Sequence, residues 1–365
     1  MSADKKINVG VIGYGLSAKV FHIPFIQALP DYNLYAIVQR SPKSGDDASA
    51  HHPDTKLFRN VDDLFADKTV DLVIVTSIPD THYEFTKRAI ESGKHVVVEK
   101  PFVPTSKEAR ELTALAKENN RLLAVYQNRR WDQDFVTLKQ LLASGKLGEI
   151  AEFETHFDRF RPDPPTRTTW KTLATPASGA LYDLGSHLLD QVYHLFGAPN
   201  SVTGFVQVQR KGLKTGDCAP DACTVLLKYG SPEDEMLVTV KSSAISSEQE
   251  QLRFWVRGTK GSFKKSHLDV QEPQLLAGVK LDSPEFGVEP SSSHGTLTVA
   301  TDGKFERETI PSIEPPPTYI EYYRTLAKAV KGEGEVPVSG DDATNVLRII
   351  ELAQASSDSG NSQPW

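Results

Sequence analysis

The chain has 365 residues, 39% of them hydrophobic and 24% charged, which is typical of a globular protein and excludes disordered, fibrous and membrane classes. A formal net charge of -7, a pI near 5.8 and the lack of a lysine- and arginine-rich run argue against nucleic acid as a partner. No stretch reaches the roughly 18 apolar residues of a membrane span, and the short polar segment Met1–Lys6 lacks the apolar region of a signal peptide, so we expect no membrane partner and a cytoplasmic location.

The length exceeds what one hydrophobic core usually serves, which predicts two domains. In the first third, short apolar runs alternate with amphipathic stretches, the pattern of a parallel sheet with crossover helices. The expected strands are Ile7–Ile12, Leu34–Val38, Leu72–Thr76, His95–Glu99 and Leu122–Tyr126. The expected helices between them include Tyr83–Ser92 and Ser106–Asn119. We therefore predict a doubly wound α/β domain over residues 1–127.

A glycine-rich turn follows the first strand, with the sequence Gly13-Tyr14-Gly15-Leu16-Ser17-Ala18. In this G-x-G-x-x-A pattern Gly13 permits a tight turn, Gly15 lets the backbone approach a pyrophosphate, and the small Ala18 lets the helix pack on the strand. The N-terminus of that helix supplies N–H donors and the positive end of a dipole. Glycines also serve ordinary turns, but the position between a strand and a helix favours a cofactor-binding turn formed by these residues.

The second strand ends in Val38-Gln39-Arg40-Ser41, without the acidic residue that normally accepts the ribose 2′-hydroxyl of NAD. Arg40 and Ser41, with Lys43 nearby, are instead suited to hold a 2′-phosphate. One charge-assisted contact of this kind contributes about 1.5 to 3 kcal/mol. The pattern predicts NADP(H) as the cofactor, with NAD(H) bound at lower affinity. The alternative is that Arg40 is only a solvated residue at the end of a strand.

The fourth apolar run ends in Glu99-Lys100-Pro101. Ligands of open α/β sheets bind at the carboxyl ends of the strands, so we expect Lys100 to face a nicotinamide there, with Glu99 beside it. Pro101 restrains Lys100 to an extended backbone. A Lys-Pro pair is also common at the end of a strand, so this motif alone leaves chemistry and scaffolding open.

Other cofactor contacts are expected where the neighbouring strands end. The loop after the third strand offers Ser77, Pro79 and His82, although His82 could instead cap the next helix. Asn128 follows the last strand of the domain and is the remaining candidate.

Residues 128–365 show a different pattern, which predicts an α+β domain with a large, mainly antiparallel sheet. A helix to Ser144, a run Ile150–Phe160 and a long helix Ala177–Phe196 precede the strand-like runs Ser201–Arg210, Ala222–Lys228, Met236–Ser242, Leu252–Arg257 and Ser262–Ser266. Loops and short strands are expected over Ser266–Pro317, helices over Tyr319–Val330 and Asp341–Ala355, and a frayed tail over Ser356–Trp365. Two cysteines, Cys218 and Cys223, are too few for a disulfide framework or a four-ligand zinc site, and they fit a reducing compartment.

The long helix carries a second chemical signal, Asp183 and His187. Residues four apart share one face of a helix. Histidine titrates near neutrality, with an unperturbed pKa of about 6.5, and suits transfer of the hydroxyl proton that accompanies hydride transfer. We therefore predict His187 as general acid/base and Asp183 as the group that orients it or binds substrate. A plain polar helix face is the alternative, and no metal is predicted because Asp183, His187 and Asp190 lack a known zinc spacing.

Three motifs in this order, Gly13-x-Gly15-x-x-Ala18, Glu99-Lys100-Pro101 and Asp183-Leu184-Gly185-Ser186-His187, resemble the Gfo/Idh/MocA oxidoreductase family over most of the chain. The segments Lys19–His22 and Tyr126–Asp132 are most similar to its NADP-preferring scyllo-inositol dehydrogenase branch. The resemblance implies a Rossmann domain followed by a domain whose sheet forms a homodimer or homotetramer interface. It also implies Lys100, Asp183 and His187 as catalytic residues, and a sugar or polyol substrate that reacts between the domains at a ring hydroxyl or ketone.

Five residues are expected to line such a substrate site: Arg129, Trp131, Arg161, Trp170 and Tyr182. An aromatic ring to stack and polar groups to form hydrogen bonds would suit a sugar ring. For each of the five, packing or surface charge is an equally good explanation.

The predicted function is thus an NADP-dependent dehydrogenase or reductase acting on the CH–OH groups of an inositol-like polyol or an aldose. One alternative is a dinucleotide- or sugar-binding sensor of the same fold without turnover, and intact Lys100, Asp183 and His187 argue against it. Another is glycoside cleavage by transient oxidation through bound NAD. The missing acid after the second strand argues against that chemistry.

Overall fold

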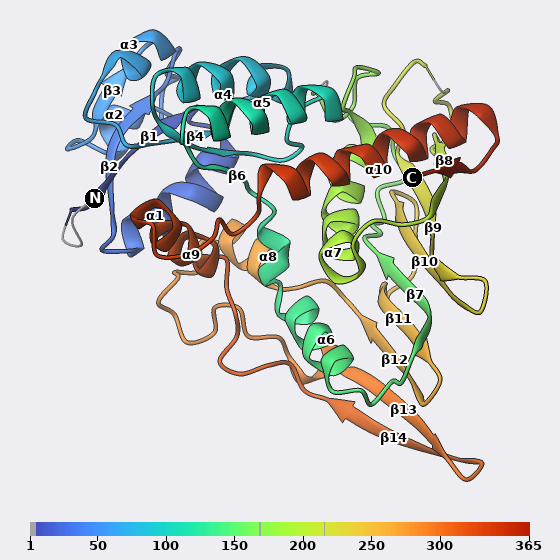
Figure 1. Ribbon diagram of the computed structural model, residues 1–365. Helices are drawn as coiled ribbons and strands as arrows, with labels where there is room; N and C mark the ends of the chain where they lie inside the picture. Colours follow the sequence, from blue (N-terminus) through green and yellow to red (C-terminus); the bar gives the residue numbers. More distant parts are fainter. Residues whose placement is uncertain (1–4, 168, 215) are drawn as a thin grey trace. The chain divides into compact units, whose positions relative to one another are not determined.

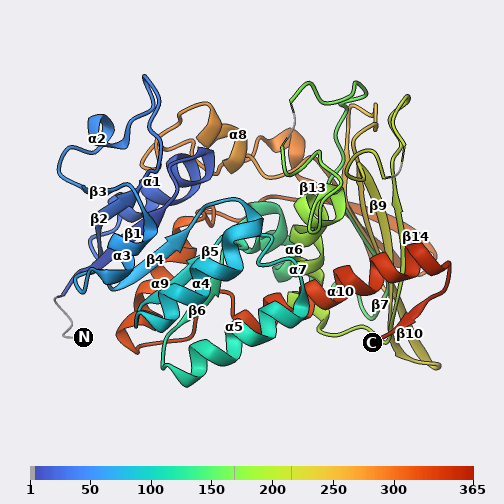
Figure 2. The ribbon, with the colours of Figure 1, turned by 90° about the horizontal axis from the view of Figure 1, so that it is seen from above.

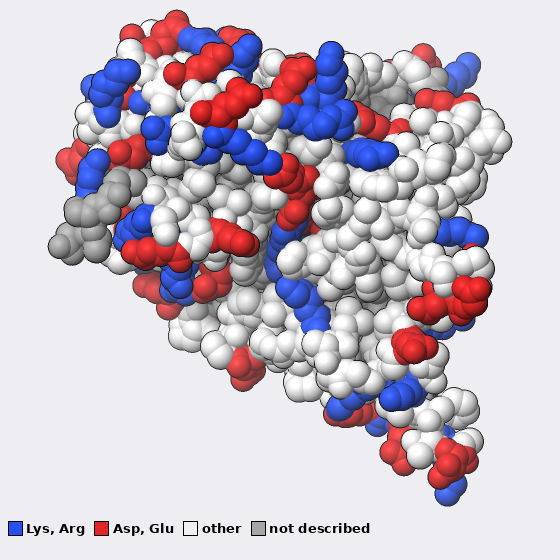
Figure 3. Space-filling model, viewed as in Figure 1, with Lys and Arg blue, Asp and Glu red and all other residues white. Residues whose placement is uncertain are grey.

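The computed structural model describes residues 5–167, 169–214 and 216–365 (Figure 1), so the first four residues of the polar N-terminal segment lie outside it. Compact unit 1 comprises Met1–Asn128, Glu272–Phe286 and Tyr319–Thr344, and unit 2 comprises Arg129–Gln271, Gly287–Thr318 and Asn345–Trp365. Within the described ranges, no helix is both long and apolar enough to cross a bilayer. On the face drawn in Figure 3, acidic and basic side chains are intermingled and form no stripe of one sign.

Two segments that the sequence assigns to the second domain belong to unit 1, although the first break, after Asn128, lies next to the expected boundary. The reason is packing between elements far apart in the sequence. Helix α9 (Ile320–Lys331) contacts helix α1 (Ile23–Ala28), and the ring of Tyr323 stacks on that of Phe25 with centroids 6.3 Å apart. Local sequence patterns carry no information about such a long-range contact.

Unit 1 is built on a parallel sheet of six strands in the order β3-β2-β1-β4-β5-β6. Its strands are β1 (Ile7–Ile12), β2 (Tyr32–Val38), β3 (Lys56–Phe58), β4 (Leu72–Val75), β5 (His95–Val98) and β6 (Leu123–Val125). All residues of β4 are buried, as expected for a strand covered by helices on both faces. The predicted doubly wound α/β domain is confirmed. The short β3 is missing from the prediction because three partly exposed residues carry no periodic signal.

Helices cover both faces of this sheet. The helical segments of unit 1 are η1 (Ala18–His22), α1 (Ile23–Ala28), α2 (Ala48–His51), α3 (Val61–Ala66), η2 (Pro79–Thr81), α4 (His82–Glu91), α5 (Ser106–Glu118), α8 (Gln271–Leu276), whose first residue belongs to unit 2, and α9 (Ile320–Lys331). Because the strand order reverses at β1 and crossovers are right-handed, α1 and α4 lie on opposite faces. Figure 1 shows α4 and α5 side by side on one face. The predicted helices Tyr83–Ser92, Ser106–Asn119 and Tyr319–Val330 are confirmed to within one residue at each end.

Unit 2 contains a nine-stranded sheet in the order β14-β13-β12-β11-β7-β10-β9-β8-β15. Its strands are β7 (Ile150–His156), β8 (Ser201–Gln207), β9 (Ala222–Ser231), β10 (Asp234–Ser243), β11 (Leu252–Gly258), β12 (Gly261–Ser266), β13 (Gly295–Thr301), β14 (Lys304–Ile310) and β15 (Gln363–Pro364). Neighbouring strands run antiparallel except β7 and β10, which are parallel. The mainly antiparallel sheet is therefore confirmed.

Helices α7 and α10 pack on this sheet, through Phe196 against Phe153 and through Ala353 against Gly204, and Figure 2 shows the sheet nearly edge-on with α7 to one side. The helical segments are η3 (Asn128–Trp131), α6 (Gln133–Ala143), η4 (Leu181–Gly185), α7 (Ser186–Phe196), η5 (Ser291–Ser293) and α10 (Gly340–Ser359), of which η3 and α10 begin in unit 1. Side chains alternate between the two faces of a strand. In β8, Gly204 faces α10 and the exposed Phe205 points to the opposite face.

The predicted helix Ala177–Phe196 begins later than expected. Ala177 and Gly179 have φ angles of 58° and 83°, outside the right-handed helical region, and the helix continues as a π-helical turn, η4, before α7. The sequence pattern extends through these residues because they are small and lie next to apolar ones, but the backbone turns at both.

The prediction of a frayed C-terminal tail is wrong. Helix α10 continues to Ser359, and β15 then pairs with β8 at the edge of the sheet. The N–H of Trp365 bonds to the carbonyl oxygen of Asn200 at 3.1 Å, and the guanidinium of Arg348 lies 4.2 Å from the centroid of the Trp365 ring. The polar composition of the tail does not indicate this order, because the tail is held in place by main-chain pairing and by its terminal aromatic residue.

Gly204 marks the closest approach of α10 to the sheet, since a Cβ there would lie 2.1 Å from the carbonyl oxygen of Ala353. We predict that Gly204→Ala pushes α10 away from β8 and lowers the free energy of unfolding by about 1 to 3 kcal/mol, the usual cost of overpacking. Urea denaturation measures this. The control is Thr203→Ala on the opposite face, which should cost less than about 1 kcal/mol. Equal losses in the two variants would contradict the prediction.

Candidate active site

The glycine-rich turn leaves β1 at the carboxyl edge of the parallel sheet. Gly13 has a φ of 101°, and a Cβ there would lie 2.9 Å from the Thr76 hydroxyl oxygen, so glycine is required. A Cβ at Gly15 would meet nothing within 4 Å, and Leu16 beside it is 63% exposed. The N–H of Lys19 bonds to the carbonyl oxygen of Gly15 at 3.2 Å and closes the first turn of the helix. This open turn at a helix N-terminus fits a pyrophosphate.

Tyr14 does not present its ring to that open side. The ring is buried, its hydroxyl lies 2.9 Å from Nδ1 of His51, and His52 packs edge-on against it. The Tyr14 side chain therefore packs the turn against helix α2.

The end of β2 carries the predicted 2′-phosphate residues on the surface. Arg40, Ser41 and Lys43 are all exposed, and within the described chain the Arg40 side chain has no hydrogen bond or ion pair. Asp46 lies in the same loop, where its backbone pairs with that of Lys43 and its carboxylate forms an ion pair with Lys19. The sequence analysis missed this acid, because it comes well after the strand instead of ending it.

Glu99 connects the turn to the predicted catalytic lysine. Its Oε1 accepts hydrogen bonds from the Ser17 hydroxyl and from Nε2 of His22, the latter at 2.9 Å, and its Oε2 accepts the N–H of Lys100 at 3.0 Å. Burial alone would raise the pKa of Glu99, but the bond and charge of His22, the Ser17 hydroxyl and the charge of Lys100 outweigh burial and lower the pKa to about 2. The carboxylate is therefore ionised at neutral pH.

His22 contacts the candidate site through Glu99, and the site prediction missed it. It is completely buried at the end of the π-helical turn η1, and its Nδ1 contacts the hydroxyl of Tyr323 while its ring lies 4.2 Å from that of Tyr126. A wider helical turn of this kind often marks a functional site. The available sequence signal was the segment Lys19–His22 beside the glycine-rich turn.

Lys100 follows β5 at the same edge of the sheet and is half-buried. The Lys100–Pro101 peptide is cis. Among the other predicted cofactor contacts, Ser77 is half-buried after β4, while Pro79 and Asn128 are buried.

The His82 side chain is buried within unit 1 and is not exposed to a cofactor site. Its ring is 1% exposed, and its nitrogens face backbone carbonyls of Ser77, Pro101 and Phe102 at 3.0, 2.9 and 3.1 Å. It is the first residue of α4, and the side chain makes no cap for that helix. The structure shows neither of the two roles considered from the sequence, cofactor contact or helix cap. The His82 side chain instead lies between the loop of Ser77 and the loop of Pro101 and Phe102.

In unit 2, Asp183 lies in the π-helical turn η4 and His187 in the first turn of α7. Asp183 Oδ1 accepts a hydrogen bond from Nζ of Lys171 at 2.7 Å, and this ammonium lies 5.2 Å from the centroid of the Trp170 ring. His187 is buried, with 6% of its surface exposed. The structure thus groups Trp170 with Asp183 through Lys171, a residue that the sequence analysis did not single out.

Asp190 forms a buried ion pair with Arg130. Arg130 donates to both of its oxygens at 2.8 Å, and the two side chains are 6% and 1% exposed. A bidentate pair of this kind needs both partners, because either charge alone would be buried without compensation. Asp190 is therefore not available as a metal ligand beside Asp183 and His187.

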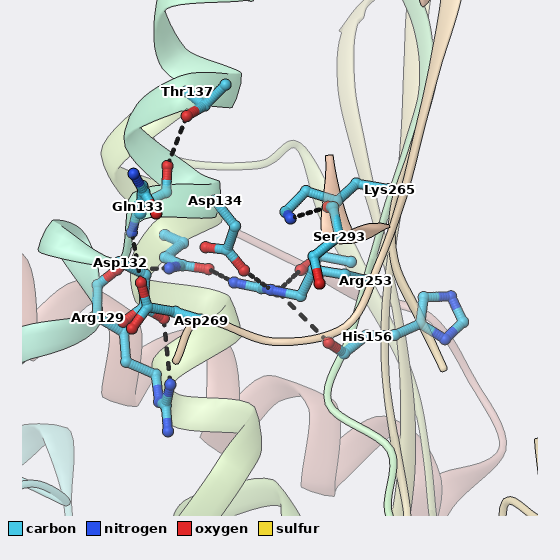
Figure 4. Close-up of polar contacts among 12 residues, drawn as sticks. Arg129, Asp132, Gln133, Asp134, Thr137, His156, Arg253, Lys265, Asp269 and Ser293 are labelled. Carbon is cyan, nitrogen blue, oxygen red and sulfur yellow. Dashed lines mark hydrogen bonds and ion pairs between the residues drawn. The ribbon is translucent and has the colours of Figure 1, made fainter. Parts of the chain in front are cut away.

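Arg129, predicted to contact substrate, belongs to the buried network in Figure 4. Its guanidinium donates to Asp132 at 3.1 Å and lies 4.7 Å from the centroid of the Phe157 ring. The carbonyl oxygen of the next predicted residue, Trp131, accepts the amide of Gln271 at 3.0 Å. These contacts give Arg129 and Trp131 a structural role at the start of α6.

The rest of this network holds α6 to the sheet of unit 2. Arg253, 1% exposed, donates to Asp134 at 2.7 Å and to Thr155 at 2.8 Å. Asp269 accepts the N–H of Gln133 at 2.7 Å (Figure 4). Burial, with the charges of the neighbouring aspartates, raises the pKa of Asp269 well above its ordinary value. The network therefore fixes the segment that leads from unit 1 into α6.

Two further residues predicted to contact substrate are Arg161 and Tyr182, and Tyr182 lies next to Asp183 in η4. Arg161 is exposed. Tyr182 lines a cavity of about 300 Å³ with Cys218 and Gln354, and burial, with the charge of Glu351, raises its pKa to about 12.

Comparison with known proteins identifies the two parts of the chain. Residues 7–127 match the description "Oxidoreductase family, NAD-binding Rossmann fold", and residues 139–364 match "Oxidoreductase family, C-terminal alpha/beta domain". Together these ranges cover most of the chain.

Similar proteins match over nearly their whole length. An uncharacterized oxidoreductase of Schizosaccharomyces pombe is 39% identical and covers 98% of each chain. The scyllo-inositol 2-dehydrogenase (NADP(+)) IolW of Bacillus subtilis is 36% identical over 96% of this chain and 94% of its own. The solved structure of YvaA from Bacillus subtilis has a TM-score of 0.91 and 34% identity over 99% of both chains. The chain therefore belongs to the Gfo/Idh/MocA family of NAD(P)-binding oxidoreductases.

Proposed function

We propose that this enzyme transfers a hydride between the nicotinamide of NADP(H) and a ring carbon that bears a hydroxyl or ketone in a sugar or polyol, with inositol-like compounds and aldoses as candidates. The observation that carries the proposal is the Glu99 carboxylate, which binds Ser17 of the glycine-rich turn and the backbone of Lys100. One side chain thus joins the turn suited to a cofactor's phosphates to the lysine suited to the reacting oxygen.

Bound NADP would supply or accept the hydride. Backbone N–H groups from Gly15 to Ser17 would hold its pyrophosphate, and Arg40, Ser41 and Lys43 would hold its 2′-phosphate. The open space beside Gly15 and the exposed, unpaired cation of Arg40 in the described chain support this assignment.

Hydride transfer at a carbon requires the oxygen on that carbon to gain or lose a proton. His187 exchanges this proton, because imidazole is an effective acid and base near neutral pH. Lys100 donates a hydrogen bond to the same oxygen and stabilises the charge that develops on it. To Asp183, which accepts a hydrogen bond from the ammonium of Lys171, we assign the role of orienting His187 or binding the substrate.

The preference for NADP(H) over NAD(H) rests on the cations after β2. The Bacillus subtilis relative named as an NADP(+)-dependent scyllo-inositol 2-dehydrogenase supports both this cofactor and a polyol substrate. Asp46 acts in the opposite direction, since a nearby carboxylate repels a phosphate, but its ion pair with Lys19 offsets that charge.

For partners and location, we propose a homodimer or homotetramer formed through the sheet face of unit 2 opposite α7 and α10. Exposed aromatic side chains, Phe205 and Trp255, lie on that sheet and support this choice. Cys218 and Cys223 are free thiols, which supports the cytoplasm as the compartment.

The His187→Asn variant tests the proton-transfer role. We expect the turnover number to fall by about 100- to 10,000-fold, the usual contribution of a general acid/base, while NADPH binds as before. Steady-state kinetics and fluorescence titration of NADPH measure the two effects. The matched control is His194→Asn on the same helix, whose ring contacts Lys139, and it should keep its turnover. Undiminished turnover in the His187 variant would remove this residue from the mechanism.

The Arg40→Asp variant tests cofactor choice. We expect the Kd for NADPH to rise about ten- to a hundredfold more than the Kd for NADH, because the variant removes one charge-assisted contact that only the 2′-phosphate makes. Parallel titrations with both cofactors measure this. Lys68→Asp makes the same change of charge at an exposed position before β4 and should alter neither constant. Equal losses for NADPH and NADH would mean that Arg40 does not recognise the 2′-phosphate.

A further inference from the structure

We propose that His82 is a positioning residue for Lys100: its buried ring holds the Lys100–Pro101 segment in place by bonding to the carbonyls that follow the lysine. The inference rests on the proposed function, in which Lys100 contacts the reacting oxygen. It assigns His82 no contact with cofactor or substrate.

The geometry joins two neighbouring loops of unit 1. Strands β4 and β5 are parallel neighbours, so the loops that follow them leave the same edge of the sheet. The His82 ring lies between these loops, with Nε2 at 3.0 Å from the carbonyl oxygen of Ser77 and Nδ1 at 2.9 and 3.1 Å from those of Pro101 and Phe102. Because the ring is 1% exposed, water does not compete for these acceptors.

The two sides of the ring are not equivalent. A carbonyl oxygen only accepts hydrogen bonds, so each contact requires a proton on the facing nitrogen. Burial lowers the pKa of His82, and the carbonyls and the charge of Glu99 offset this only in part. A neutral ring carries one proton, and the Nδ1 side offers two acceptors where the Nε2 side offers one. We therefore assign the proton to Nδ1, which bonds the ring to the Lys100 loop.

With this bond, the backbone is held by hydrogen bonds on both sides of the Lys100 side chain. On one side, Glu99 Oε2 accepts the N–H of Lys100 at 3.0 Å. On the other, His82 donates to the carbonyl of Pro101, the next residue. With the backbone fixed before and after it, the lysine side chain starts from a set position and direction. An error of about 1 Å in a reacting group can cost roughly a hundredfold in rate.

Three variants separate the two sides of the ring in the full-length protein. The amide nitrogen of Asn reaches about as far as Nδ1 and that of Gln about as far as Nε2, so the Asn side chain can donate to the Lys100 loop and the Gln side chain only toward the carbonyl of Ser77. The Phe side chain can donate to neither. We expect turnover to fall by roughly ten- to a hundredfold in the Phe and Gln variants, to recover largely in the Asn variant, and the Kd for NADPH to stay within about threefold throughout.

A second readout makes the test independent of turnover. With lysines labelled by ¹³C-reductive methylation, the NMR signal of Lys100, identified by its loss in Lys100→Arg, should shift in the Phe and Gln variants and return in the Asn variant. If the wild type shows no turnover with any polyol but these shifts appear, the proposed reaction fails and the positioning role stands. An unshifted Lys100 signal, or a wild type that turns over and three variants that match its turnover, would overturn the role of His82. If the Phe variant does not fold, as judged by circular dichroism, the comparison of Asn with Gln decides alone.

Discussion

The bonding of the Glu99 carboxylate is the constraint on which the cofactor-facing half of the molecule depends. A buried carboxylate is costly unless hydrogen bonds and opposite charge compensate it, and losing one partner of a buried ion pair typically costs about 3 to 5 kcal/mol. Glu99 meets this requirement with Ser17 and His22 from the first helix and with the N–H of Lys100. The glycine-rich turn, the first helix and the candidate catalytic lysine are therefore fixed relative to one another by one side chain.

Sequence patterns predict the elements of unit 1 well because they are local and strongly periodic. The buried strand β4 and the amphipathic helix α5 follow directly from composition and spacing. The attachment of α9 to unit 1 does not, because its partner α1 lies about three hundred residues earlier in the chain. The tail fails for a related reason: β15 is ordered by pairing with β8, which its polar sequence does not indicate.

Some residues of the candidate site could also be predicted from the sequence, and others could not. Motifs identify Gly13, Gly15 and Lys100, because their roles require particular residue types at particular places on the sheet edge. They do not distinguish groups that face a ligand from groups that support those that do. His82 and Arg129 carry the polar chemistry of contact residues, yet the structure gives His82 three backbone carbonyls and Arg129 a buried aspartate. Lys171 was missed because an ion pair between residues separated in the sequence leaves no periodic pattern, and Asp46 was missed because it lies well beyond the end of its strand.

The most direct test of the account is nicotinamide absorbance on mixing the enzyme with NADPH or NADP and a panel of inositols, inososes, aldoses and ketosugars, after titration shows that the cofactor is bound. The account predicts tighter binding of NADPH than of NADH and an absorbance change with at least one hydroxyl–ketone pair. Tight binding of NADPH with no absorbance change across the whole panel would contradict the enzyme's proposed substrate class, and it would favour a protein of this fold that senses the dinucleotide without turning over these compounds.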